Sequence, residues 1–136
     1  MPELEKRGEV IFRAAYGETA DDVQGLLEKI YPDGSEHLTA LVCYPILNSS
    51  AGWFCNAIAY GSVCGYTDIL DQLETSYVLV GSLIAVDTPR QIGWHLGNAR
   101  RAGASLEQIR AIREIAICAS QSAGVRWRNV IPEVKE

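Results

Sequence analysis

Histidine, methionine and paired cysteines are scarce in this chain of 136 residues. It contains two histidines, His37 and His95, and a single methionine. Its four cysteines, at positions 43, 55, 64 and 118, form no C-x-x-C pair and have no metal-ligand spacing to either histidine. This spacing argues against a zinc site or a disulfide framework and favours buried thiols. We therefore expect no metal site.

Positive charge and long apolar runs are scarce as well. The chain has 12 Lys and Arg against 17 Asp and Glu, a net charge of −5, so nucleic acid and anionic membranes are poor candidates as partners. The longest apolar run, residues 77–86, is about half of what a membrane span needs. The charged N-terminus lacks the apolar core of a secretory signal. These absences predict a cytoplasmic protein that binds neither nucleic acid nor membrane.

Internal repeats and low-complexity segments are absent, and the remaining pattern is a series of helix signals in one domain, residues 1–136. Apolar periodicity, capping residues and helix-ending Gly or Pro predict helices over 3–16, 20–31, 35–43, 53–65 and from 67 or 68 to 86. The segment 53–65 is the least defined, since the period of a short apolar run does not distinguish a helix from a strand. The short tail after residue 124 is expected to dock Trp127 and Ile131 on a neighbouring element. The predicted fold is all-α.

The clearest signal is a central helical hairpin over residues 88–123. Thr88 is placed as an N-cap, Pro89 suits the first helical position, and Gln91 completes a T-x-x-Q capping box. Ser105 and Gln108 repeat the capping pattern at the start of the second helix. A glycine follows each helix, where the left-handed backbone of a C-terminal cap is expected.

Inside the first helix of the hairpin, two glycines and a histidine stand out. Gly93 and Gly97 share one face, and each costs about 0.5–1 kcal/mol relative to alanine, so we expect another helix or a ligand to approach that face. His95 points to a different side, between Trp94 and Leu96. A histidine among apolar neighbours is either a core residue bound to a carbonyl or a general acid/base whose pKa is easily moved near 7.

Two acids could orient such an imidazole, Glu74 on the preceding helix and Glu114 on the following one. For Glu114, an ion pair with Arg110 four residues earlier is the simpler interpretation. A solvated helix face is likewise expected for the basic residues of the hairpin, which are Arg100, Arg101, Arg110 and Arg113.

The segment from Leu73 into the second helix of the hairpin includes P-R-Q-I-G-W-H-L-G-N-A-R-R-A-G-A-S followed by E-Q-I-R-A-I. It resembles the carboxymuconolactone decarboxylase family of the AhpD-like superfamily over roughly residues 70–125. The resemblance implies an AhpD-like, all-helical subunit that assembles into trimers or hexamers. It also implies active sites near subunit contacts, with no metal or organic cofactor.

By this resemblance the chain is expected to be a cofactor-independent lyase or isomerase that acts on a small cyclic lactone, keto acid or polyketide-like substrate. The departures from the family pattern, given below, suggest a tailoring step of secondary metabolism. His95 is the expected general acid/base, with Tyr60 or Glu74 assisting it. The expected substrate-binding residues are Trp53, Tyr77, Arg90 and Trp94.

Two departures from the family pattern keep other functions open. The peroxidase branch needs a C-x-x-C at the positions of Thr88 and Gln91, which speaks against disulfide-based peroxide reduction. The usual acid of the preceding helix falls at Ser76. The alternatives are a non-catalytic binding or assembly protein on the same scaffold and, as a third reading, a thiol peroxidase that uses Cys55 and Cys64.

Overall fold

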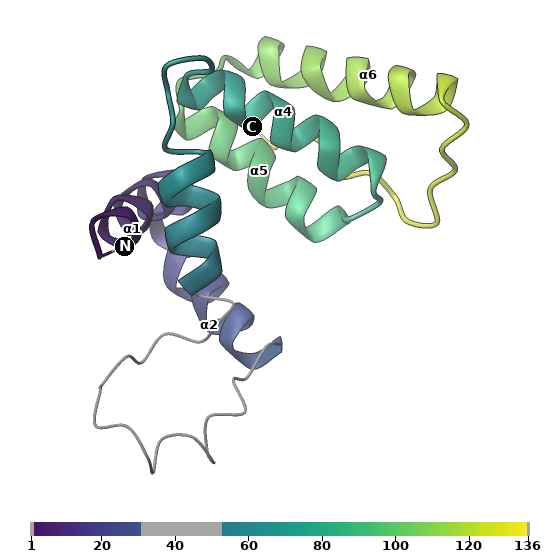
Figure 1. The fold of residues 1–136 in the computed structure, drawn as a ribbon. Coiled ribbons are helices and arrows are strands. Elements are labelled where there is room, and N and C mark those ends of the chain that lie inside the picture. The colour runs from purple at the N-terminus through teal and green to yellow at the C-terminus, as the bar shows by residue number, and fades with distance from the viewer. Residues whose placement is uncertain (1, 31–52, 136) are drawn as a thin grey trace. The chain divides into compact units, whose positions relative to one another are not determined.

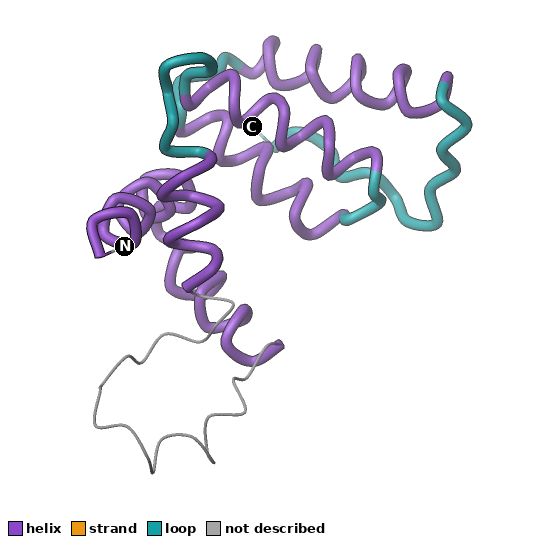
Figure 2. The backbone as a smooth tube through the Cα atoms, viewed as in Figure 1, coloured by secondary structure: helices purple, strands orange, loops and turns teal. Residues whose placement is uncertain are grey.

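The computed structural model describes residues 2–30 and 53–135, which form helices, turns and an extended tail, with no strand in these ranges (Figure 2). The all-α prediction is thereby confirmed for this part of the chain. Two compact units are present, Met1–Tyr66 and Thr67–Glu136, and each is described by itself. Two compact units can belong to one domain, so the single domain over residues 1–136 stays a prediction.

The first unit contains two α-helices, a short 3₁₀ turn and a π-helix. These are α1 (Pro2–Tyr16), η1 (Gly17–Thr19), α2 (Ala20–Ile30) and η2 (Phe54–Val63) (Figure 1). Gly17 has a φ of +55°, so α1 ends where the sequence predicted. Asp21 and Asp22 lie in the first turn of α2, where the helix dipole favours negative charge. The predicted helix 35–43 and His37 lie outside the described residues.

The segment 53–65 is helical as predicted, but it is wound as a π-helix. The amide of Cys64 donates to the carbonyl of Ala59, five residues earlier, at 2.8 Å. This i→i+5 bonding widens each turn, so the buried residues of η2 recur at intervals of four to five (56, 57, 60 and 61). The wide turn explains why the apolar pattern of this segment fits no ordinary helical period.

Helices α1 and η2 touch backbone to backbone. A Cβ atom on Gly8 would overlap the carbonyl oxygen of Asn56, and one on Gly61 would overlap the carbonyl oxygen of Leu4. Arg7 reinforces the contact, because its Nη2 and Nε donate to the carbonyl oxygen of Gly61 at 2.6 and 2.9 Å. Glycine is needed at both positions to let the two backbones approach this closely.

The second unit is built from α4 (Gln72–Ala85), α5 (Pro89–Arg101) and α6 (Leu106–Ser122), with α4 packed against both of the others. The helix before the hairpin begins later than predicted. Asp71, and not Thr67 or Asp68, is its N-cap. The core consists of small and aliphatic side chains from the three helices and the turn between α5 and α6: Val80, Ile84, Ile92, Leu96, Ala99, Ala104, Ile109 and Ala116.

The predicted hairpin is present as α5 and α6, and most of its caps are confirmed. Ser105 and Gln108 form the reciprocal capping box of α6, and Gly103 and Gly124 have positive φ values of 104° and 83°. Thr88 is the N-cap residue of α5, but the predicted capping box is wrong. Its hydroxyl donates to the carbonyl of Leu83 at 3.2 Å, so it serves the preceding helix instead.

The C-terminal tail, residues 125–135, turns back after α6 and lies against the helices of its unit (Figure 1). Trp127 and Ile131 pack on the core, as the sequence predicted, and the indole Nε1 of Trp127 donates to the carbonyl of Ile84 at 2.7 Å. Asp87, at a φ of +58°, accepts from the backbone amide of Arg128 at 2.8 Å. These contacts fix the path of the tail.

Candidate functional site

His95 lies on the inward face of α5 and is only 7% exposed. Burial lowers the pKa of its imidazole from 6.5 to about 4, because desolvation disfavours the charged form. A carboxylate placed beside the ring would instead favour the imidazolium and raise the pKa. His95 is therefore a neutral, buried side chain near pH 7.

The side-chain amide of Asn98 is one polar neighbour of this ring. Its Nδ2 lies 3.4 Å from Nδ1 of His95, and its Oδ1 accepts from Nη1 of Arg101 at 3.1 Å. Because Arg101 can only donate, the amide oxygen faces Arg101 and the amide nitrogen faces the ring. This arrangement favours Nδ1 of His95 as an acceptor, and hence the neutral imidazole.

Glu74 is not available as the acid that assists His95. Its carboxylate Oε2 accepts from the backbone amide of Asp71 at 2.9 Å, and its own amide donates to Oδ1 of Asp71 at 2.8 Å. The pair forms the capping box of α4, at an exposed position. The sequence pattern D-x-x-E at residues 71–74 is the signal that could have identified this structural role.

Tyr60 belongs to an aromatic cluster of the first unit. Its ring meets Phe12 edge to face at a centroid distance of 5.2 Å, and its hydroxyl lies 3.1 Å from the hydroxyl of Tyr16. Burial raises the pKa of Tyr60 far above its ordinary value, and the neighbouring Tyr16 hydroxyl adds to the shift. Such a phenol keeps its proton and packs in a core. Trp53 precedes η2 in the same unit and is partly buried.

Arg90 and Trp94, two of the predicted binding residues, do lie together. They line a groove of about 590 Å³ between α5 and the end of the C-terminal tail, here called the α5 groove. Its other lining residues are Pro89, Gly93, Leu96, Gly97, Arg100, Arg101, Ile109, Pro132, Glu133, Val134 and Lys135. Tyr77, the third predicted binding residue of this unit, packs against the core on α4, and its buried hydroxyl has no hydrogen-bond partner among the described residues.

The two glycines of α5 line this groove, and their environment corrects one expectation. Among the described residues, leaving aside the backbone of α5 itself, no atom lies within 4 Å of a Cβ built on Gly93, and Nη1 of Arg101 lies 3.4 Å from one built on Gly97. Among the described residues no other helix approaches this face, so the alternative of a ligand stays a prediction. The glycines leave the backbone of α5 bare along one wall of the groove.

Arg113 is a further correction, because it is buried and not part of a solvated face. Its guanidinium donates to the carbonyls of Pro132 and Ile131, at 2.8 and 3.2 Å, and to the carboxylates of Glu114 and Glu133, at 2.8 and 2.7 Å. The sequence predicted an ion pair between Glu114 and Arg110, whereas in the structure Glu114 pairs with Arg113. Arg113 thus joins α6 to the C-terminal tail, a role that only the returning tail could reveal.

The cysteines only partly follow the prediction of buried thiols. Cys118 is exposed, whereas Cys55 and Cys64 are partly buried, and Cys43 lies outside the described residues. Burial raises the pKa of Cys55 to about 11 and that of Cys64 in the same direction. Thiols with raised pKa values are poor nucleophiles, which speaks against the thiol peroxidase reading. Among the described residues, no group of three His, Cys, Asp or Glu is placed to hold a metal ion.

Comparison with known proteins identifies relatives in two yeasts, and both are named Peroxisomal protein 2. The one from Saccharomyces cerevisiae is 36% identical over 86 residues, which cover 61% of this chain and 30% of the relative. The one from Schizosaccharomyces pombe is 26% identical over 126 residues, which cover 93% of this chain and 51% of the relative. The chain therefore spans no more than about half the length of these relatives. No family model and no solved structure matches it.

These findings contradict the central functional predictions. Neither relative is named as a decarboxylase, and no family model supports the carboxymuconolactone decarboxylase family. The predicted lyase or isomerase activity is therefore wrong, in agreement with the neutral, buried His95 and the capping role of Glu74. The predicted cytoplasmic location is contradicted by the peroxisomal names. Within the described residues, no helix has the length and apolar character needed to cross a membrane.

Proposed function

We propose that this chain is a non-catalytic binding and assembly protein of the peroxisome that takes an anionic, partly apolar small molecule in the α5 groove. The location rests on the names of the two yeast relatives. The non-catalytic role rests on one observation above all. His95 is held neutral and buried beside the amide of Asn98. A general acid/base must exchange protons with a ligand, and a ring with a pKa of about 4 is a poor proton donor near pH 7.

The composition of the α5 groove supports the ligand class. Arg90, Arg100 and Lys135 bring positive charge to it, while the carboxylate of Glu133, the one acid among its described lining residues, is bound by Arg113 at 2.7 Å. Apolar side chains, including Trp94 and Val134, also line it. A concave, largely apolar site of several hundred Å³ with a few charged groups is typical of small-molecule binding. Guanidinium groups suit a carboxylate because they donate in a fixed fork.

Binding of octanoate, with octanamide as the neutral control, tests this assignment by titration calorimetry on the whole chain. We expect octanoate to bind at least about tenfold more tightly than octanamide, because only the carboxylate forms charge-assisted hydrogen bonds. The double variant Arg90→Gln/Arg100→Gln and the filling variant Gly93→Leu should each weaken octanoate binding. Arg126→Gln/Arg128→Gln, an equal change of charge outside the groove, should not.

Equal affinity for the acid and the amide would contradict the assignment of the groove, as would binding that survives the Gly93→Leu change. His95→Gln serves to separate binding from catalysis. Since His95 does not line the groove, octanoate affinity should be unchanged in this variant. The location is tested by imaging a fluorescent fusion of the chain beside a peroxisomal marker in yeast, where a diffuse cytosolic signal would contradict the proposal.

Self-assembly is the remaining part of the proposal. Val78 on α4 is 55% exposed and Ile115 on α6 is 62% exposed, and burying such side chains against a second copy would be favourable. Sedimentation equilibrium should give a mass above the 14.9 kDa of one chain, and Ile115→Glu should lower it. A monomer at micromolar concentration would remove assembly from the proposal without affecting the groove.

A further inference from the structure

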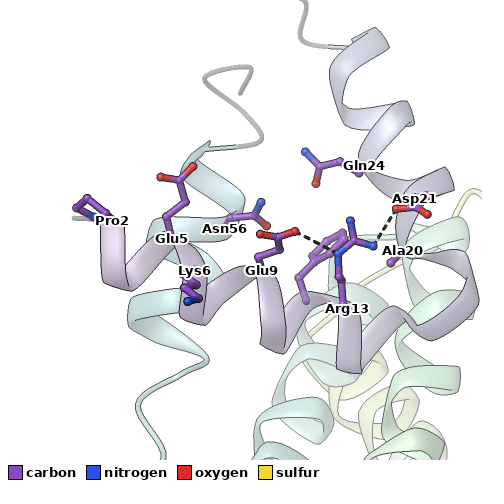
Figure 3. A pocket seen from close by; sticks show the side chains of 10 residues that line it. Pro2, Glu5, Lys6, Glu9, Arg13, Ala20, Asp21, Gln24 and Asn56 are labelled. Carbon is purple, nitrogen blue, oxygen red and sulfur yellow. Dashed lines mark hydrogen bonds and ion pairs between the residues drawn. The ribbon is translucent and has the colours of Figure 1, made fainter. Parts of the chain in front are cut away.

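One wall of the α5 groove is held in a different way from the walls of the hollow in the first unit. That hollow, of about 290 Å³, is lined by residues of α1, α2 and η2 (Figure 3), so its walls are helices with backbone hydrogen bonds of their own. In the α5 groove, residues 132–135 line one side, and they belong to no helix or strand. Such a wall stays in place only through its contacts with the neighbouring helices.

Arg113 on α6 makes polar contacts that hold this wall. Its Nε donates to the carbonyl of Pro132 at 2.8 Å, and its Nη2 donates to the carbonyl of Ile131 at 3.2 Å and to the carboxylate of Glu133 at 2.7 Å. One guanidinium thus binds three consecutive residues of the tail. Arg113 is not among the described lining residues of the groove. It therefore acts on the groove through the tail.

The guanidinium has a further partner that does not leave with the tail. Its Nη1 donates to the carboxylate of Glu114, the next residue on α6, at 2.8 Å. A buried charge that loses its partners is strongly destabilising. Arg113 keeps Glu114 if the tail moves away, and water replaces the tail acceptors once the tail no longer covers the side chain. Opening of this wall therefore leaves no unpaired buried charge.

The tail is anchored at two separate points. Trp127 packs on the core, and its indole Nε1 donates to a carbonyl of α4 at 2.7 Å. Arg113 binds the tail again at residues 131–133. Val130 lies between the two anchors and is 88% exposed, so it adds little packing. Residues 131–135, here called the tail flap, can therefore move while Trp127 stays in place.

We propose that the tail flap opens and closes over the α5 groove, and that Arg113 is the positioning residue that couples its closure to binding of the anionic ligand. This inference rests on the proposed function of the groove. The flap supplies Val134 and Lys135 to the lining, one apolar side chain and one cation, and both are lost when it opens. The closed state therefore binds the ligand more tightly, and by linkage the ligand favours closure.

Glu133→Ala and Glu114→Ala test this coupling as a matched pair, because each removes one carboxylate bound by Arg113. In titration calorimetry of the whole chain, Glu133→Ala should weaken octanoate binding about fivefold or more, since the flap loses an anchor. Glu114→Ala leaves the flap contacts intact and should keep the affinity of the wild type. Direct electrostatics predicts the opposite sign for Glu133→Ala, because loss of a negative charge from the wall should strengthen binding of an anion.

Heteronuclear NOE values of the backbone amides of residues 133–135 test the coupling from the side of the flap, and they need no variant. We expect these values to rise when the wild-type chain is saturated with octanoate, because the ligand favours the closed, less mobile flap. They should fall in unliganded Glu133→Ala. Amides in the middle of α6 serve as the internal reference and should not respond.

Octanoate binding that is unchanged or tighter in Glu133→Ala would overturn the coupling and leave the groove as an anion site. Equal losses in Glu133→Ala and Glu114→Ala would overturn it too, because the effect would then be a general loss of stability. The same holds if bound octanoate leaves the NOE values of the flap unchanged. Absence of octanoate binding to the wild-type chain would instead contradict the proposed function, and the coupling would fall with it.

Discussion

The side-chain amide nitrogen of Asn98 lies 3.4 Å from Nδ1 of His95, one turn earlier on α5. Arg101 donates to the oxygen of the same amide at 3.1 Å, so the three side chains form one chain of polar contacts along the helix. An imidazolium would present an N–H to the amide N–H, because both ring nitrogens are donors in the charged form. The amide of Asn98 thus adds to the effect of burial and opposes the protonation of His95.

Acid should weaken the fold through His95. Near pH 7 the ring is neutral in both states, and its contribution to the free energy of unfolding is fully present. As the pH falls below 6.5 the unfolded chain binds a proton that the folded chain accepts only near pH 4, so stability is lost over this window. The loss reaches at most about 3 kcal/mol. Urea unfolding at pH 7 and pH 4.5 measures it.

The variant His95→Gln isolates this contribution from that of the carboxylates, which titrate in the same range. Glutamine does not titrate, so the difference in unfolding free energy between wild type and variant should shrink as the pH falls. A difference that stays constant from pH 7 to pH 4.5 would show that His95 titrates alike in both states.

Gly8 should tolerate no side chain. Alanine at this position would drive its Cβ into the carbonyl oxygen of Asn56, and neither backbone can yield without separating α1 from η2. We expect Gly8→Ala to lower the free energy of unfolding by about 3 kcal/mol or more. Gly25→Ala is the matched control, since nothing lies within 4 Å of its Cβ, and it should stabilise α2 by about 0.5–1 kcal/mol. Similar losses in both variants would contradict the close contact.

Arg113 should be the main anchor of the C-terminal tail. Arg113→Ala removes its bonds to the carbonyls of Ile131 and Pro132 and to Glu133, at a cost of about 2–3 kcal/mol. Amide hydrogen exchange should speed up across residues 125–135. Arg126→Ala, which changes an exposed arginine of the same tail, should leave exchange unchanged. Unaltered protection in Arg113→Ala would mean that the apolar contacts of Trp127 suffice.

The cysteines should differ sharply in reactivity. At pH 8, Cys55 with a pKa of about 11 has about a thousandth of its thiol ionised, while Cys118 is exposed to reagent. Mass spectrometry after brief iodoacetamide treatment should therefore find Cys118 alkylated at least about a hundredfold faster than Cys55. Equal rates would show that the first unit opens readily, and denaturation should abolish the difference.

Local sequence signals predicted where the helices lie, but they predicted the capping contacts and the helix winding only in part. The S-x-x-Q pattern at Ser105 and the glycines at 103 and 124 act within one turn of the chain, and the structure confirms them. Thr88 has the same kind of pattern, but its hydroxyl turns to the carbonyl of Leu83 in the previous helix. The π-helical winding of η2 escaped prediction because the period of a short apolar run does not specify how the helix is wound.

The sequence singled out several residues of α5 as candidates for a site, but it did not predict what each of them does in the structure. Gly93, Arg90 and Trp94 stood out on one helix, and they do line the α5 groove, whose other wall comes from residues 132–135. His95 also stood out, yet no sequence pattern discloses that it is buried beside Asn98. The sequence analysis interpreted these residues as an active site. The side chains that surround them come from elements distant in the chain, so their burial and partners could not be predicted.

The sequence by itself determined that this protein is helical, where most helices begin and end, and that its net charge is negative. Capping, glycine conformation and apolar periodicity act between residues a few positions apart, so they can be read along the chain. Tertiary structure alone decided that His95 is buried beside Asn98 and that Arg113 holds the tail. Burial, hydrogen-bond partners and pKa depend on which side chains the fold brings together, and sequence spacing does not fix these.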